Sequence, residues 1–216
     1  MNLRVYETFS SIQGESSYAG IPCFFIRLAG CPLRCAWCDT RKAQDPAAGR
    51  LRTVEDLIRE ADEAARPLVE VTGGEPLAQE HTADLCEGLL RAGHTVLIET
   101  NGAEAVSRLP EGVVRILDFK TPSSGMERAM LPENFRTLRP CDEVKFVIAD
   151  ENDYVFAKRV LTEYRLPSQI RNILFSPAFG LADGRKLCEW ILRDRLPVRI
   201  NLQFHKIIWG PACEGV

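Results

Sequence analysis

The sequence predicts an α/β protein built as a partial, open TIM-like barrel of about six parallel strands with outer helices. Short β-rich runs alternate with helical patterns over most of the chain, which is the order of a parallel sheet with crossover helices. The runs at 67–71, 95–99 and 113–119 are largely apolar, as in strands that are covered on both faces. Six or seven such runs are too few for a closed barrel of eight strands, so we expect the barrel to be open.

The expected elements follow in order along the chain. Strands are expected at Pro22–Leu28, Pro67–Thr72, His94–Thr100, Gly112–Phe119, Glu143–Ile148, Asn172–Phe175 and Val198–Leu202. Helices are expected at Val54–Ala65, Glu80–Ala92, Asn152–Glu163 and Asp183–Arg193, with N-caps at Thr53, Asn152 and Asp183. Leu3–Phe9 is expected to add an edge strand, and residues 43–50 a surface loop.

Length and composition limit the class of protein. A chain of 216 residues is expected to form one domain, and 45% hydrophobic with 26% charged residues is typical of a globular protein. The net charge of −3 and the pI of about 5.7 favour neither nucleic acid nor an anionic membrane as a partner. The sequence contains neither a signal peptide nor an apolar run long enough to span a membrane, so we expect a cytoplasmic protein.

The loops of unusual composition all follow expected strands. They contain the cysteines at 31–38, Gly73-Gly74-Glu75-Pro76, Thr100-Asn101-Gly102, residues 120–125 and Ser176-Pro177. Because the carboxyl ends of parallel strands meet at one edge of a sheet, we expect these loops to share one rim and to carry the chemistry.

Three of the eight cysteines, Cys31, Cys35 and Cys38, form a C-x3-C-x2-C pattern within one loop. Soft thiolate ligands select zinc or an iron–sulfur cluster. A structural zinc site normally draws four ligands from two separated pairs, and no second pair is present, so we expect a four-iron cluster with one iron left open. The alternative is a zinc site completed by Asp39 or Cys23. The other five cysteines are expected to be buried small hydrophobic residues.

The cysteine pattern, with Trp37 before its third member, resembles the signature of the radical S-adenosylmethionine (SAM) superfamily. Gly73-Gly74-Glu75-Pro76 resembles the loop with which that superfamily binds the methionine amino group of SAM. The resemblance implies a [4Fe-4S] cluster whose open iron binds SAM. Reductive cleavage of SAM then yields a 5′-deoxyadenosyl radical.

The flanking segments narrow the resemblance. Residues 7–15, 20–28, 37–40 and 203–210 resemble the 7-carboxy-7-deazaguanine synthases, and the likeness runs from Val5 to about Pro211. This implies conversion of 6-carboxy-5,6,7,8-tetrahydropterin to 7-carboxy-7-deazaguanine with loss of ammonia, in queuosine and deazapurine biosynthesis. The resemblance further implies assistance by Mg²⁺, reduction of the cluster by an electron-donor protein such as flavodoxin, and a homodimer. The single domain would comprise an N-terminal extension (1–21), a core (22–203) and a segment that closes over substrate (204–216).

The resemblance also assigns roles to residues. Substrate contacts are expected from Ile12, Gln13, Gly14, Glu15, Arg27, Thr72, His205 and Pro211. SAM contacts are expected from Trp37, Cys38, Asp39, Gly74, Glu75, Asp118, Lys120, Ser176 and Pro177. Cys31, Cys35 and Cys38 would hold the cluster, and Thr40 would face Mg²⁺.

Simpler roles remain open for some of these residues. Arg27 could be a surface residue, Thr40 could cap a turn, and His205 could belong to the core. Glu99 could be a paired structural carboxylate or a ligand. Ser16 departs from the family, which often has glycine there, and the contact expected from Pro211 is the least secure.

Two other functions are considered. A radical SAM activating enzyme that forms a glycyl radical on a partner protein would share the cysteine pattern but not the Gln13, Glu15 and Arg27 set. A non-catalytic zinc protein would lack sulfide.

Overall fold

The computed structural model describes residues 1–211, 213 and 215. Its strands are β1 (Asn2–Ile12), β2 (Pro22–Leu28), β3 (Arg50–Thr53), β4 (Leu68–Gly73), β5 (Thr95–Thr100), β6 (Val114–Asp118), β7 (Glu143–Ile148), β8 (Asn172–Pro177) and β9 (Arg199–Ile200). Its α-helices are α1 (Val54–Ala64), α2 (Thr82–Arg91), α3 (Glu151–Glu163), α4 (Gly184–Asp194) and α5 (Phe204–Ile208).

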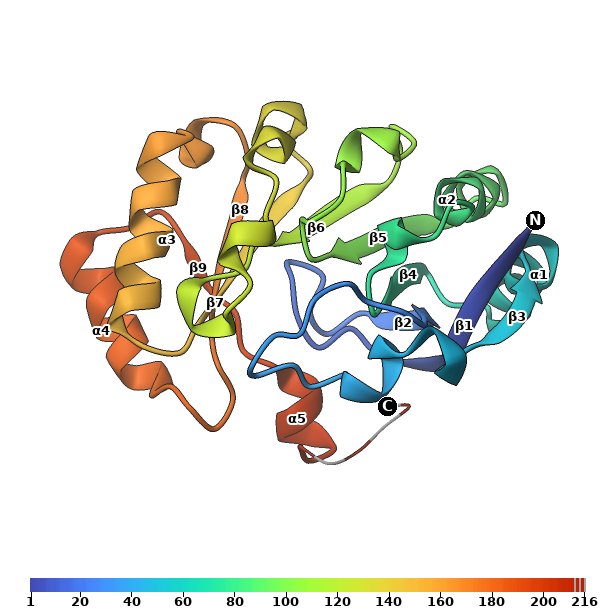
Figure 1. Ribbon diagram of the computed structural model, residues 1–216, viewed down its shortest axis with the longest axis horizontal. Coiled ribbons are helices and arrows are strands. Elements are labelled where there is room, and N and C mark those ends of the chain that lie inside the picture. Colours follow the sequence, from blue (N-terminus) through green and yellow to red (C-terminus); the bar gives the residue numbers. More distant parts are fainter. Residues whose placement is uncertain (212, 214, 216) are drawn as a thin grey trace.

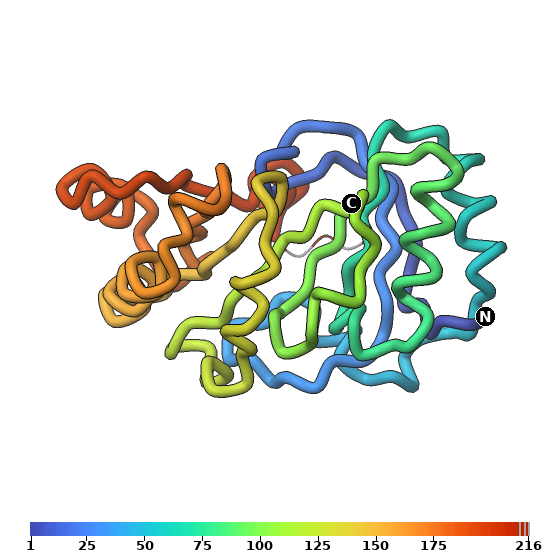
Figure 2. The backbone as a smooth tube through the Cα atoms, turned by 90° about the horizontal axis from the view of Figure 1, so that it is seen from above, coloured from blue at the N-terminus to red at the C-terminus, as the bar shows by residue number. Residues whose placement is uncertain are grey.

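The strands form one curved sheet in the order β3-β1-β2-β4-β5-β6-β7-β8-β9. From β2 to β9 every neighbouring pair is parallel, and β1 joins both β2 and β3 in antiparallel pairs. The sheet curves around a central space, with α1 and α2 outside one end and α3 and α4 outside the other (Figures 1 and 2). This is the predicted open α/β barrel.

Alternation along the strands separates two faces of the sheet. Phe24, Ile26 and Leu28 of β2 pack with helix residues such as Leu57 and Leu85 in the large core under the helices. The residues between them face the inside of the barrel, where Cys23 and Phe25 join Leu68, Leu97, Val114 and Ile116 in a smaller apolar cluster. The inside is therefore apolar near the start of these strands.

Most helix caps and strands are where the sequence predicts them, with three corrections. Thr53 and Asp183 cap α1 and α4 as expected, accepting hydrogen bonds from the backbone N–H groups of Asp56 and Arg185. The cap of α3 is Asp150 rather than Asn152, since its carboxylate accepts from Asp153 N. β1 is longer than expected and is not the edge strand, because residues 50–53 form β3 beyond it.

The cysteines outside the loop divide into two groups. Cys23 and Cys86 are buried as expected, whereas Cys188 is partly exposed and Cys141 and Cys213 are exposed, so the expectation was wrong for these three. Within the described residues, no helix combines the length and the apolar character that crossing a membrane requires.

Candidate active site

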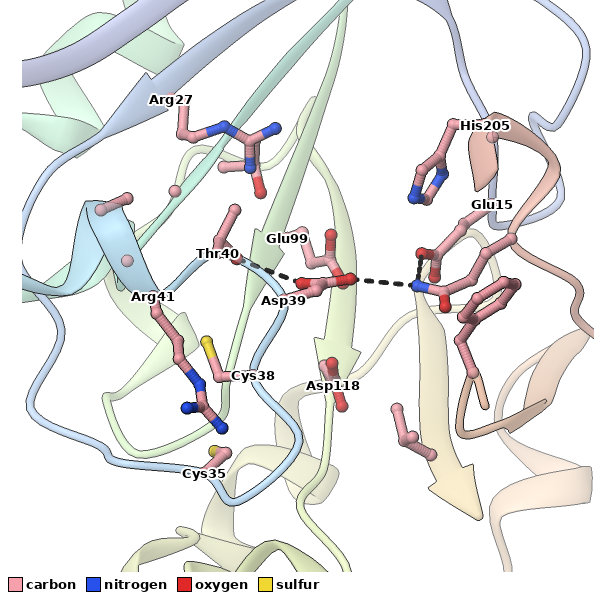
Figure 3. A pocket seen from close by; sticks show the side chains of 18 of the residues that line it. Glu15, Arg27, Cys35, Cys38, Asp39, Thr40, Arg41, Glu99, Asp118 and His205 are labelled. Atoms are coloured by element: carbon pink, nitrogen blue, oxygen red, sulfur yellow. Dashed lines mark hydrogen bonds between the residues drawn. The ribbon is translucent and has the colours of Figure 1, made fainter. Parts of the chain in front are cut away.

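A layer of polar side chains crosses the inside of the barrel above the apolar cluster. Each parallel strand from β2 to β8 contributes at least one of them: Arg27, Glu70, Thr72, Glu99, Asp118, Lys145 and Ser176. They line a pocket of about 650 Å³, which is within the usual range for small-molecule sites. Figure 3 shows side chains from the strands, the cysteine loop and α5 directed into this space.

The cysteine loop lies at the pocket, and Cys31, Cys35 and Cys38 all line it. Asn101, in the loop after β5, donates a long hydrogen bond from Nδ2 to Cys31 Sγ at 3.6 Å. Burial raises the pKa of Cys31 and raises that of Cys35 to about 11, although Lys120 opposes the shift. These thiols therefore stay protonated until a metal group displaces their protons.

Of the two ligands considered for a fourth zinc position, one lies away from the cysteine loop and the other has a cationic partner. Cys23 is buried in the apolar cluster at the other end of β2. Asp39 lines the pocket but is ion-paired with Lys206 at 2.7 Å. Among the residues described, no three His, Cys, Asp or Glu side chains are grouped to hold a single metal ion.

The glycine loop after β4 approaches the cysteine loop closely. A Cβ on Gly74 would lie 2.1 Å from the carbonyl oxygen of Gly30, so only glycine fits there. Gly73 and Gly74 line the pocket, but Glu75 does not. Glu75 is fully buried, and its carboxylate accepts hydrogen bonds from Leu77 N at 2.9 Å, Thr100 Oγ1 at 2.7 Å and Asn101 N at 2.7 Å. This carboxylate therefore ties β4 to β5, and the expected contact of Glu75 with SAM stays a prediction.

Arg27 is directed into the pocket and is not a surface residue, since its side chain is 19% exposed. Its Nε donates to Glu7 Oε1 at 2.8 Å, and the guanidinium lies 5.5 Å from the centre of the Phe9 ring. Thr72, opposite Arg27 on β4, also lines the pocket.

Ile12, the last residue of β1, and Gln13, Gly14 and Glu15 in the loop that follows all line the pocket. Gln13 does not present a free amide: its Nε2 donates to Glu70, and its Oε1 accepts from Glu15 N at 2.9 Å. Ser16 has a positive φ of 64°, a conformation that favours glycine, and its N–H donates to Asn201 Oδ1 at 2.9 Å. The loop thus holds its shape through contacts with β4 and with the segment after β9.

Lys145 is a buried cation shared by three carboxylates. Its Nζ lies 3.0 Å from Glu15 Oε2 and 3.3 Å from Asp118 Oδ2, and it also contacts Glu99. Burial alone would lower the pKa of Lys145, but these acids raise it well above its usual value, so it is charged. Glu99 is therefore a paired carboxylate that also lines the pocket.

Asp118 and Lys120 lie at the end of β6, where Lys120 Nζ is 2.8 Å from Asp118 Oδ2. Lys120 also lies 5.0 Å from the centre of the Trp37 ring, whose Nε1 donates to Ser123. Ser176 and Pro177 line the pocket from β8. The expected SAM residues other than Glu75 thus all line the pocket.

The helix α5 and the residue before it contact two loops that line the pocket, the loop after β1 and the loop after β2. Phe204 N donates to Gly14 O at 2.9 Å, and Gln203 Nε2 donates to Glu15 at 2.9 Å and to Asp39 at 3.3 Å (Figure 3). Lys206 holds Asp39, and the pKa of Asp39 is lowered because Lys206 outweighs the effect of burial.

His205 lines the pocket and is not a core residue. A Cβ on Gly14 would lie 2.5 Å from His205 Nδ1, so the glycine permits this approach. Burial lowers the pKa of His205, which favours the neutral ring at pH 7. Pro211 lines the pocket as well, whereas residues 212, 214 and 216 of the expected closing segment lie outside the described residues.

Thr40 lines the pocket next to Asp39, and its Oγ1 lies 3.3 Å from Asp39 Oδ1. Its side chain makes no capping hydrogen bond to the 3-10 helix that follows, so the capping role is not seen.

Sequence reasoning missed several residues that line the pocket, among them Glu7, Glu70, Lys145 and Gln203. For Glu70 and Lys145 a signal existed, because each is a charged residue at an inward position of an otherwise apolar strand. Glu7 and Gln203 gave no such signal.

Comparisons with known proteins identify the family of this chain. The radical SAM superfamily model matches residues 25–118. A 7-carboxy-7-deazaguanine synthase of Koribacter versatilis is 42% identical over 99% of this chain and 100% of its own length. The synthase of Chlorobaculum tepidum is 44% identical over 99% and 97%. The crystal structure of QueE from Escherichia coli is similar in fold, with 24% identity, a TM-score of 0.77 and 95% of both chains covered. This chain therefore belongs to the 7-carboxy-7-deazaguanine synthase family of the radical SAM superfamily.

Proposed function

We propose that this enzyme converts 6-carboxy-5,6,7,8-tetrahydropterin to 7-carboxy-7-deazaguanine with loss of ammonia. The observation that carries the proposal is one pocket lined by the three loop cysteines, by Arg27 and by the carboxylates around Lys145. Relatives that match this chain from end to end have the synthase name, which does not favour the glycyl-radical activating enzyme.

The donor sets fit the cofactors that the family implies. Three cysteines of one loop reach the pocket and would hold the [4Fe-4S] cluster, while Gly74, Trp37, Asp118, Lys120, Ser176 and Pro177 would hold SAM. Thr40 Oγ1 beside a carboxylate oxygen of Asp39 is a hard-oxygen donor set that suits Mg²⁺. When bound, the cluster and SAM supply a 5′-deoxyadenosyl radical that takes a hydrogen atom from substrate.

The remaining residues would bind and orient the pterin. Arg27 presents a cation to the substrate carboxylate, and Glu15 presents an anion to the guanidine-like amino edge, a strong charge-assisted contact. Gln13, held at both ends of its amide, fixes the Glu15 backbone rather than reading substrate through its side chain. His205, which lines the pocket beside Gly14, would contact the substrate.

The proposal includes an electron donor, an oligomeric state and a cellular location. Reduction of the cluster requires a one-electron donor protein such as flavodoxin, and the enzyme would act as a homodimer. A cytoplasmic location suits thiolates that must not form disulfides.

The test is turnover by the anaerobically reconstituted protein with SAM, a reductant, Mg²⁺ and 6-carboxytetrahydropterin. Deazaguanine formation, lost in Cys35→Ala, is the expected result. Formation of 5′-deoxyadenosine alone would retain the radical chemistry and reject the substrate.

A further inference from the structure

The contact between Glu7 and Arg27 depends on an irregularity in β1. Val5 lies opposite Leu28, but Glu7 lies opposite Arg27, so the register shifts by one residue between them. Had the register of Val5 continued, Glu7 would lie opposite Ile26, which is buried in the core under the helices. Directly opposite residues of an antiparallel pair point to the same face, so this β-bulge turns Glu7 into the pocket.

Because of the bulge, Glu7 and Phe9 contact the Arg27 guanidinium, one at its Nε edge and the other at one of its faces. Glu7 occupies Nε at 2.8 Å, and Phe9, which stacks on Phe25 with ring centres 4.9 Å apart, covers one face of the guanidinium. The two terminal nitrogens have no hydrogen-bond partner among the described residues, and Arg27 lines the pocket.

We propose that Glu7 is a positioning residue that fixes how Arg27 receives the substrate carboxylate. A free arginine can take a carboxylate side-on, through Nε and one terminal nitrogen, or end-on, through both terminal nitrogens. Glu7 blocks the side-on approach and leaves only the end-on approach. This inference rests on the proposed function, because it assumes that Arg27 binds the carboxylate of a pterin.

The effect is expected in specificity more than in affinity for anions. Glu7 is itself negative and lies beside the same guanidinium, so it weakens binding of an anion that arrives from an arbitrary direction. A substrate whose carboxylate lies on the end-on axis meets an arginine that is already oriented. Glu7 would therefore select the position of the carboxylate on the pterin ring.

The test compares binding of two stable oxidised pterins, 6-carboxypterin and 7-carboxypterin, to the anaerobic holoenzyme with SAM and Mg²⁺, measured by calorimetry. The ratio of the two affinities should fall at least fivefold in Glu7→Ala. It should stay within twofold of wild type in Glu7→Gln, whose amide oxygen still accepts from Nε. If Glu7→Ala fails to fold, Glu7→Thr keeps the strand preference but is too short to reach Arg27.

A matched control and a double variant separate positioning from general damage. Glu60 pairs with Arg52 at 2.9 Å with similar exposure but lies outside the pocket, so Glu60→Ala should leave the ratio unchanged. Arg27→Ala should abolish the preference for 6-carboxypterin over 7-carboxypterin, and adding Glu7→Ala should not change the affinity ratio further.

Three outcomes would count against the inference. An unchanged ratio in Glu7→Ala or Glu7→Thr would overturn it, and so would additive losses in the double variant. Both results would leave the proposed function intact. A wild-type enzyme that binds neither pterin would overturn the proposed function and this inference together.

Discussion

Replacing Glu75 with alanine should lower the free energy of unfolding by about 3–5 kcal/mol. The buried carboxylate accepts hydrogen bonds from Leu77 N, Thr100 Oγ1 and Asn101 N. Each buried donor left without a partner costs about 1–3 kcal/mol. Burial raises the pKa of Glu75 to about 7, against three hydrogen bonds that lower it, so part of this cost is already present in the wild type. We therefore expect less than the sum of three losses.

The assay is thermal unfolding under anaerobic conditions, together with SAM affinity. For a chain of this size each kcal/mol shifts Tm by about 2–4 °C, so Glu75→Ala should lower Tm by about 6–20 °C. Glu75→Gln retains an acceptor but presents an amide N–H₂ to at least one donor, which costs about 1–3 kcal/mol. Since Glu75 does not line the pocket, SAM affinity of the folded Gln variant should stay within about twofold.

The opposite pattern would refute this reasoning. A Glu75→Gln protein with unchanged Tm and at least tenfold weaker SAM binding would mean that the carboxylate acts as a ligand rather than as a tie between strands.

Three further predictions follow from the same structure. The pKa of Glu75 rises from 4.5 to about 7 on folding, so the native state binds the extra proton and stability falls as pH rises through this window. The wild type should lose about 3 kcal/mol between pH 4.5 and 7 relative to Glu75→Gln, and parallel denaturation curves for the two proteins would contradict this. Cys35→Ala should abolish iron and sulfide binding, whereas Cys86→Ala, a buried cysteine outside the loop, should bind both normally; equal iron content in the two variants would exclude Cys35 as a ligand. Lys206→Met should speed amide hydrogen exchange of residues 204–210 while global stability changes by at most about 1 kcal/mol, because Asp39 in that ion pair is 48% exposed. Lys158→Met, whose pair with Asp194 lies outside the pocket, is the control, and exchange that is equally slow in both variants would show that Lys206 does not secure α5.

The parallel strands were predictable because each is a short apolar run between turn residues. The strand Pro22–Leu28 and the strand Glu143–Ile148 have the predicted bounds. β3 was missed because Arg50–Thr53 is short and polar, and only its pairing with β1 makes it a strand. Such pairing between distant segments leaves no periodic signal in the sequence.

The part of the pocket formed by loops of unusual composition was predictable. The cysteines and glycines that follow strands indicated the rim of the pocket, because such clusters at strand ends are typical of loops that bind a ligand. The hydrogen bonds of Glu75 were not predictable, because its motif does not reveal that Thr100 and Asn101, at the end of another strand, donate to its oxygens. Glu7 was missed because a bulge is set by the register of two strands, which composition does not show.

The loop after β1 is hydrogen-bonded to residues that come much later in the chain, and this has a consequence for the order of folding. Ser16 is bonded to Asn201, Ser17 to Glu143 and Gly14 to Phe204. These contacts join residues far apart in sequence, which makes them slow to form because long loops must close first. During synthesis the contacts of residues 201–206 with the loop after β1 and with Asp39 can therefore form only after this late segment has left the ribosome.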